Sequence, residues 1–87
     1  MNIDVPQYNE QGLALVWEDN FQISCSVNGA AVCIQANGAG LVSLARHMLE
    51  LAQDNAPEFS HIHLDSFNSL EEGSAELIII KKSSTMG

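Results

Sequence analysis

Two histidines and an aspartate stand at alternate positions late in the chain, as His61-x-His63-x-Asp65. In a β-strand every second side chain points to the same face, so these three would lie together, with neighbours about 7 Å apart. Imidazoles and carboxylates are ligands for zinc and iron, which makes His61, His63 and Asp65 candidate metal ligands. The same spacing is typical of the solvent face of a half-buried strand. We favour that interpretation, because spacing alone is often matched by chance.

Four carboxylates stand in or beside the segment that follows this row: Asp65, Glu71, Glu72 and Glu76. Neighbouring carboxylates in a solvated loop lack the desolvation that a catalytic acid–base pair requires. Such a cluster can instead bind Lys or Arg side chains, and we predict that these four residues contact a basic partner. The alternative is a solvated loop without a partner.

The remaining candidates for chemistry are weaker. Asn37-Gly38-Ala39-Gly40 precedes a helical pattern and could cradle an anion, but no lysine follows it and no nucleotide-binding motif is complete. Helix capping and close packing explain it better. Neither Cys25 nor Cys33 has a positive neighbour that would make it a reactive thiolate. We therefore expect a protein that is not an enzyme and holds no cofactor.

The net charge of the chain bears on which class of partner it can bind. The 87 residues carry a formal net charge of −8, and the three cations are Arg46, Lys81 and Lys82. Nucleic-acid affinity comes largely from cations on phosphates, and three scattered cations build no such patch. An anionic membrane surface would repel the chain for the same reason. A basic protein would be attracted, which is compatible with a protein partner. The equally weighted alternative is that the acidity only keeps a small protein soluble.

Length and hydropathy predict one cytoplasmic domain over residues 1–87. No apolar run approaches the roughly 20 residues that a membrane helix needs. The first residues lack the basic region and apolar stretch of a signal peptide, so both thiols are expected to be reduced. A domain this short buries a limited core, which makes a homodimer a natural alternative to a monomer.

The first half of the chain predicts two hairpins after a polar arm over residues 1–11. Alternating apolar residues favour a strand over 13–17, a loop at Glu18-Asp19-Asn20 with Asn20 left-handed, and a strand over 21–27. Asn28-Gly29 predicts a type I′ turn into a third strand over 30–36. That turn pairs Val27 with Ala30, Cys25 with Val32, Ile23 with Ile34 and Ser24 with Cys33. The two thiols then lie on opposite faces and form no disulfide.

A helix follows, capped by Asn37 and ending near residue 54, before Pro57. Its apolar stripe is expected to face the core, and consists of Leu41, Leu44, Ala45, Met48, Leu51 and Ala52. The opposite side is expected to face solvent, and consists of Ser43, Arg46, His47, Glu50, Gln53 and Asp54.

The last third predicts two strands, 60–65 and 76–81, joined by a turn-rich loop over 66–75 and followed by a frayed tail over 83–87. The order β-β-β-α-β-β favours an α+β fold, with about five strands in one antiparallel or mixed sheet and one amphipathic helix on one face. The other sheet face would be open to a partner or a second copy. Ile78 and Ile80 would lie at the interface of a homodimeric adaptor domain.

The second half of the chain resembles a known family. The similar strings are Gly40-Leu41-x-x-Leu44-Ala45, Leu51-Ala52-Gln53, His61-x-His63-Leu64-Asp65 and Leu70-Glu71-Glu72-Gly73-Ser74-x-Glu76-Leu77-Ile78-Ile79. Over residues 37–81 the chain is similar to the immunity protein 32 family of bacterial polymorphic toxin systems. The resemblance implies a cytoplasmic protein that neutralises a cognate toxin by direct binding, and a basic nuclease is one such toxin. The alternatives are a small metal-binding module or enzyme, or a homodimeric adaptor.

Overall fold

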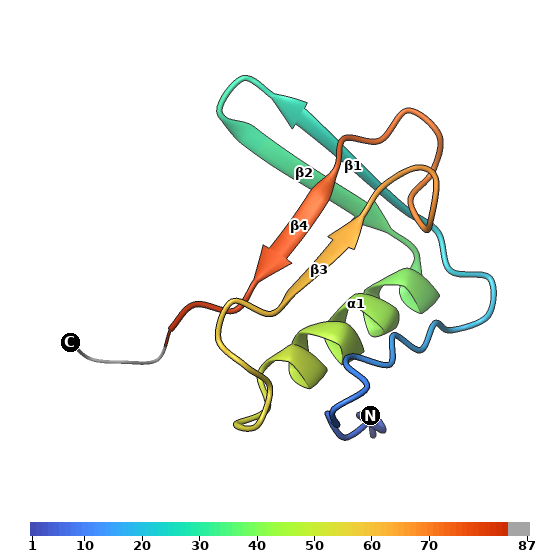
Figure 1. The fold of residues 1–87 in the computed structure, drawn as a ribbon. Coiled ribbons are helices and arrows are strands. Elements are labelled where there is room, and N and C mark those ends of the chain that lie inside the picture. Colours follow the sequence, from blue (N-terminus) through green and yellow to red (C-terminus); the bar gives the residue numbers. More distant parts are fainter. Residues whose placement is uncertain (84–87) are drawn as a thin grey trace.

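The fold is α+β, as the sequence predicts, but its strands form two separate sheets. The computed structural model describes residues 1–83, so Ser83 is the only described residue of the predicted frayed tail. The elements are β1 (Ile23–Asn28), β2 (Ala31–Ala36), α1 (Gly38–Leu51), β3 (His61–Leu64) and β4 (Leu77–Ile80). β1 pairs with β2 and β3 pairs with β4, both antiparallel (Figure 1). The prediction of a single five-stranded sheet is not confirmed.

The predicted strand over residues 13–17 is wrong. This segment runs alongside α1 (Figure 1), and no strand among residues 1–83 pairs with it. Side chains of the helix bind its backbone instead. Ala14 N donates to Glu50 Oε2 at 2.6 Å, and Glu18 N donates to Ser43 Oγ at 2.9 Å. These contacts satisfy backbone groups that a neighbouring strand would otherwise bind.

The loop after this segment matches its prediction in one respect. Asn20 has a φ of 64°, the left-handed conformation expected of it. The rings of Trp17 and Phe21 stack with centroids 4.4 Å apart, although no ladder joins their backbones. The left-handed residue therefore brings the two aromatic side chains together without forming a hairpin.

The hairpin of β1 and β2 has the predicted faces but a shifted turn. The observed pairs are Val27–Val32, Cys25–Ile34, Ile23–Ala36 and Ser26–Cys33. Gly29 and Ala30 form the turn, and Gly29 alone of the two has a positive φ, which is typical of a type II′ turn rather than type I′. A shift of two positions keeps the same apolar residues on one face. Cys25 is buried and Cys33 exposed, and both are free thiols.

Asn37 caps α1 as predicted, because its Oδ1 accepts a hydrogen bond from Gly40 N at 2.8 Å. Its side chain also accepts from Gln22 N at 3.0 Å, which ties the residue just before β1 to the start of the helix. Gly40 is tightly enclosed: a Cβ there would lie 2.6 Å from the carbonyl oxygen of Gln22 and 2.8 Å from Cγ1 of Ile23. Close packing therefore requires glycine at this position. The helix ends at Leu51, three residues before its expected end.

The orientation predicted for α1 is right in part. Leu44 and Leu51 of the predicted inner stripe are buried core residues, and Asp54 of the predicted solvent side is exposed. Other residues on both sides are placed wrongly. Leu41 of the predicted inner stripe is 55% exposed, and Met48 and Ala52 are exposed as well. Four residues of the predicted solvent side are instead buried: Ser43, Arg46, His47 and Glu50. The reason is that residues 1–20 cover this side of the helix, and their backbone needs polar partners.

The pairing of β3 with β4 confirms the predicted alternation. Ile62 and Leu64 are each 1% exposed, whereas the His61 and His63 side chains face outward. The segment before β4 follows the free edge of β1, where Glu71 N donates to Ile23 O at 2.8 Å. The core lies between these sheets and α1, and its buried members are Ile23, Cys25, Leu44, Leu51, Ile62, Leu64 and Leu70. No helix among residues 1–83 is both long and apolar enough to cross a membrane.

Candidate partner-binding surface

The loop that follows β3 is shaped by Asp65. One carboxylate oxygen of Asp65 accepts hydrogen bonds from Phe67 N at 2.9 Å and Asn68 N at 3.1 Å. The main-chain oxygen of Asp65 also accepts from Leu70 N at 2.8 Å. This is the pattern by which an Asp side chain replaces a backbone turn. Asp65, a predicted contact residue, therefore holds the loop in place.

His63 lies between two carboxylates on the outer face of the β3–β4 sheet. Its Nε2 lies 3.6 Å from Asp65 Oδ2 and 3.4 Å from Glu76 Oε2. Glu76 reaches this position because His63 pairs with Ile78 in the ladder, which brings the residues just before β4 beside the end of β3. Protonation of His63 would make both contacts ion pairs.

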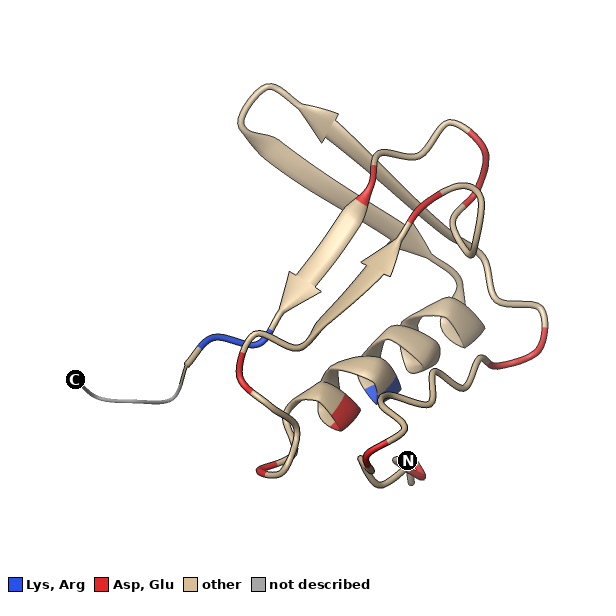
Figure 2. Ribbon diagram, in the orientation of Figure 1, with Lys and Arg blue, Asp and Glu red and all other residues tan. Residues whose placement is uncertain are grey.

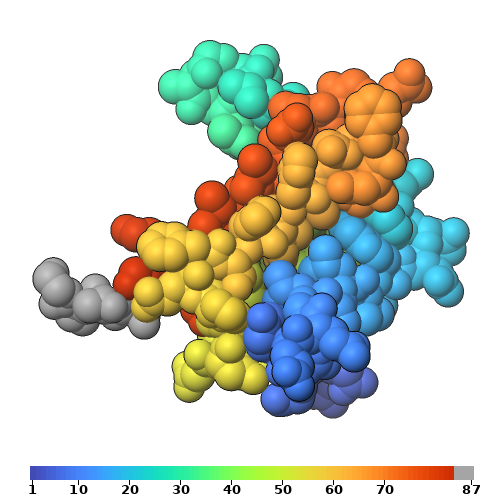
Figure 3. All heavy atoms as spheres, in the orientation of Figure 1, coloured from blue at the N-terminus to red at the C-terminus, as the bar shows by residue number. Residues whose placement is uncertain are grey.

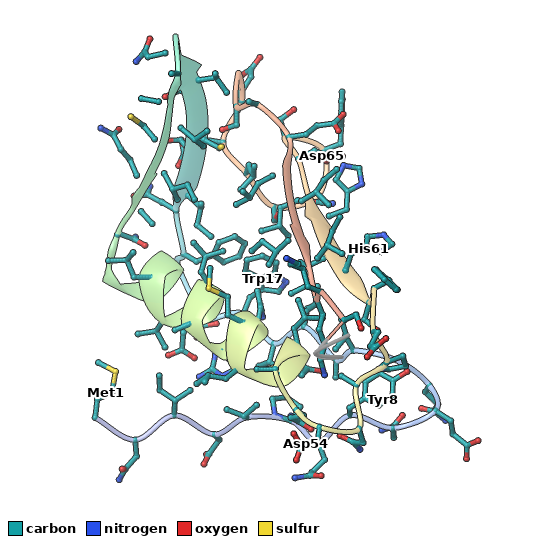
Figure 4. The ribbon with its side chains drawn as sticks, turned by 90° about the vertical axis from the view of Figure 1, so that its left-hand side faces the viewer. Met1, Tyr8, Trp17, Asp54, His61 and Asp65 are labelled. Atoms are coloured by element: carbon teal, nitrogen blue, oxygen red, sulfur yellow. The ribbon has the colours of Figure 1, made fainter. Side chains whose placement is uncertain are left out.

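The metal candidates are only partly brought together. Figure 4 shows His61 and Asp65 on the side of β3 that points away from α1, whereas Trp17 lies on the inner side. His61 is paired with Ile80, two ladder positions from His63. Among residues 1–83 no group of three histidine, cysteine or acidic side chains is arranged to hold a metal ion.

The acidic loop surface, defined here as Asp65, Glu71, Glu72 and Glu76, lies at one end of the β3–β4 sheet (Figure 2). Glu71, Glu72 and Glu76 are exposed, while Asp65 is partly covered by its own loop. The backbone of this region is anchored to β1 through Glu71 N and through Ala75 N, which donates to Cys25 O at 2.8 Å. The carboxylates are therefore presented from a fixed backbone.

Two of the three cations are used inside the molecule. Arg46 is 8% exposed and its Nη1 lies 3.2 Å from Glu18 Oε2. Lys81 Nζ donates to the carbonyl oxygens of Gln53 at 2.6 Å and Ala56 at 2.8 Å, just after the end of α1. Lys82 remains as the exposed cation of the three. The solvent-facing charge is therefore dominated by carboxylates.

An apolar surface that the sequence did not predict lies on the outer side of α1. Leu41, Met48 and Leu49 are all exposed. Beside them a shallow groove of about 170 Å³ lies between α1 and β4, lined by Met48, Leu51, Ala52, Ile79 and Lys81. One sequence feature could have indicated it. Ser43, His47 and Glu50 share one side of the helix, and such polar residues can bind the unpaired backbone groups of the N-terminal segment, which leaves the apolar side uncovered.

Sequence comparison assigns the chain to a family. A sequence model of immunity protein 32 matches residues 31–82, which is more than half of the 87 residues. The chain belongs to the immunity protein 32 family. In this family member the matched segment runs from β2 to just beyond β4 and contains the whole acidic loop surface, whereas the arm and β1 precede it. Neither curated proteins nor solved structures provided a match.

Proposed function

We propose that this immunity protein 32 family member neutralises a cognate protein toxin by binding it directly, without catalysis, in the bacterial cytoplasm. The observation that carries the proposal is the family match over residues 31–82. We further propose that the acidic loop surface contacts a basic region of the toxin, such as the substrate cleft of a nuclease. A cleft that binds phosphates is rich in Lys and Arg, which are the groups that exposed carboxylates attract.

The anchored backbone supports this proposal. Glu71 N is bound to Ile23 O and Asp65 closes its own turn, so the loop is ordered before a partner arrives. Binding then costs little backbone entropy, because the loop need not be fixed during association. The exposed Glu71 and Glu72 would act mainly on the rate of encounter, through long-range attraction.

The test requires a candidate toxin, which is to be sought among the products of the neighbouring genes. Its affinity for this chain is measured by calorimetry and its association rate by stopped flow. Glu71→Lys combined with Glu72→Lys changes the net charge from −8 to −4. A matched variant, Glu10→Lys with Asp54→Lys, makes the same change at exposed positions outside the acidic loop surface. We expect the first variant to lower the association rate by about tenfold and to flatten its salt dependence. The matched variant should change both much less.

Two results would contradict the contact surface. Equal losses in the two variants would mean that net charge alone governs association. Unchanged binding in the first variant would remove the acidic loop surface from the interface. Failure of the candidate toxin to bind the wild-type chain, or of the chain to protect cells that express it, would refute toxin neutralisation itself.

A further inference from the structure

β2 is an open strand edge. On one side it pairs with β1 over six positions, and no strand among residues 1–83 pairs with its other side. The far edge of β1 is already occupied, because Ile23 O and Cys25 O accept hydrogen bonds from Glu71 N and Ala75 N. The hairpin projects from the body of the molecule (Figure 3), and every residue of β2 except Ala36 is exposed.

This edge lacks the features that normally prevent pairing. Natural edge strands are protected by charged residues, proline, bulges or very short length. β2 reads Ala-Val-Cys-Ile-Gln-Ala, without charge or proline, and its register with β1 is continuous. Residues 20–45 contain no charged residue, although the chain carries −8. A second copy can therefore approach this edge without bringing carboxylates of the two hairpins together.

The register of the hairpin decides which backbone groups are free. A two-residue turn at Gly29 and Ala30 makes Asn28 and Ala31 a hydrogen-bonded pair. Alternation along β2 then turns the N–H and C=O groups of Val32, Ile34 and Ala36 away from β1. Antiparallel pairing of β2 with another β2 must place these outward residues opposite one another. If the pairing is centred on Cys33, Val32 lies opposite Ile34 of the second copy, and both are exposed apolar residues.

We propose that two copies of this chain pair through their β2 edges, antiparallel and in register about Cys33, to form a four-stranded sheet in the order β1-β2-β2-β1. Such an interface is isologous and closes with two copies. Cys33 then opposes Cys33 of the second copy at a non-hydrogen-bonded position. Cα atoms are about 4.5 Å apart at such positions, within the range that a disulfide accepts. β1 separates this seam from the acidic loop surface, so the dimer is independent of toxin binding.

The first measurement is the mass of the full chain by sedimentation in reducing buffer over a range of micromolar concentrations. Val32→Lys places a charge on the edge, while Val27→Lys places the same charge at its neighbour on β1. The two valines are 63% and 60% exposed and directly paired, so the variants are closely matched. We expect the wild type and Val27→Lys to form dimers and Val32→Lys to be monomeric. A monomeric wild type overturns the proposal.

The second measurement leaves the edge uncharged and tests its register. Diamide oxidises thiols, so the wild type should form a dimer linked through Cys33, seen on a non-reducing gel and lost in Cys33→Ser. In the variant Cys33→Ser with Gln35→Cys, the two new thiols would be four positions out of register, about 13 Å apart. We expect this variant to crosslink at least about tenfold more slowly, because its thiols cannot meet without strand slippage. Equal crosslinking rates would overturn the proposed pairing.

Discussion

Replacement of Arg46 by alanine should release the N-terminal segment from α1. Arg46 Nε donates to Asp4 O at 3.0 Å and its Nη1 donates to Val16 O at 3.3 Å. The same guanidinium pairs with Glu18 at 3.2 Å. One side chain of the helix thus holds three separate points of residues 1–20. No strand among the described residues 1–83 pairs with this segment.

The size of the effect follows from how much water can replace the lost contacts. A hydrogen bond to a charged group contributes about 1.5–3 kcal/mol when its partner stays dry. Asp4 and Val16 are exposed residues and the Glu18 side chain is 43% exposed, so rehydration recovers much of this. The partly exposed ion pair adds no more than about 1 kcal/mol. We therefore expect Arg46→Ala to lower the free energy of unfolding by about 2 kcal/mol, a large share of the roughly 5–15 kcal/mol typical of small domains.

Urea unfolding followed by the fluorescence of Trp17 measures this loss, and hydrogen exchange locates it. The amides of Ala14 and Glu18 should exchange faster. The exchange rates of amides in the β3–β4 ladder should change only as far as the free energy of global unfolding changes. Lys82→Ala removes an exposed cation and is the matched control, with an expected change within about 0.5 kcal/mol. If Arg46→Ala changed the free energy of unfolding no more than this control and left both amides protected, Arg46 would not anchor the N-terminal segment.

Two further predictions concern the interior. Burial and, secondarily, the Arg46 charge lower the pKa of His47 below its usual value of 6.5, so the unfolded chain takes up a proton first as pH falls. Stability should therefore decline below about pH 6.5, by at most about 1.4 kcal/mol per pH unit, and His47→Gln should flatten that slope. Gly40→Ala should lower the unfolding free energy by about 1–3 kcal/mol through its close contacts, whereas Gly38→Ala, with open space around it, should be neutral or stabilising. Equal melting temperatures for the two glycine variants would refute the packing argument.

Local signals were sufficient for part of the fold. The cap at Asn37, the left-handed Asn20 and the outward histidines of β3 were all predicted, and all three are observed. Each depends on the chemistry of a few adjacent residues: an amide that binds a helix N-terminus, a side chain that tolerates positive φ, and period-two alternation. The hairpin faces were also predicted, because a two-position slip does not exchange the faces of a strand.

The orientation of α1 could not be predicted in this way. An apolar stripe indicates the buried side of a helix only when the material packed against it is apolar. Here residues 1–20 bring unpaired backbone groups, and Ser43 and Glu50 satisfy two of them. Hydropathy counts side chains and ignores the backbone of a distant segment, so it placed Leu41 inside and His47 outside. Both placements are wrong.

Some features of the candidate site also follow from the sequence, whereas others follow only from the fold. The amino-acid sequence is enough to show that the molecule is acidic, that carboxylates gather around residues 65–76, and that the family strings lie in the second half. Three features become visible only in the folded chain: Asp65 builds its own loop, Glu76 contacts His63, and Arg46 and Lys81 bind groups within the molecule. Composition and local pattern depend on neighbours in the chain. Which charges remain free for a partner depends on the pairing of segments far apart in sequence, through the β3–β4 ladder and the arm along α1.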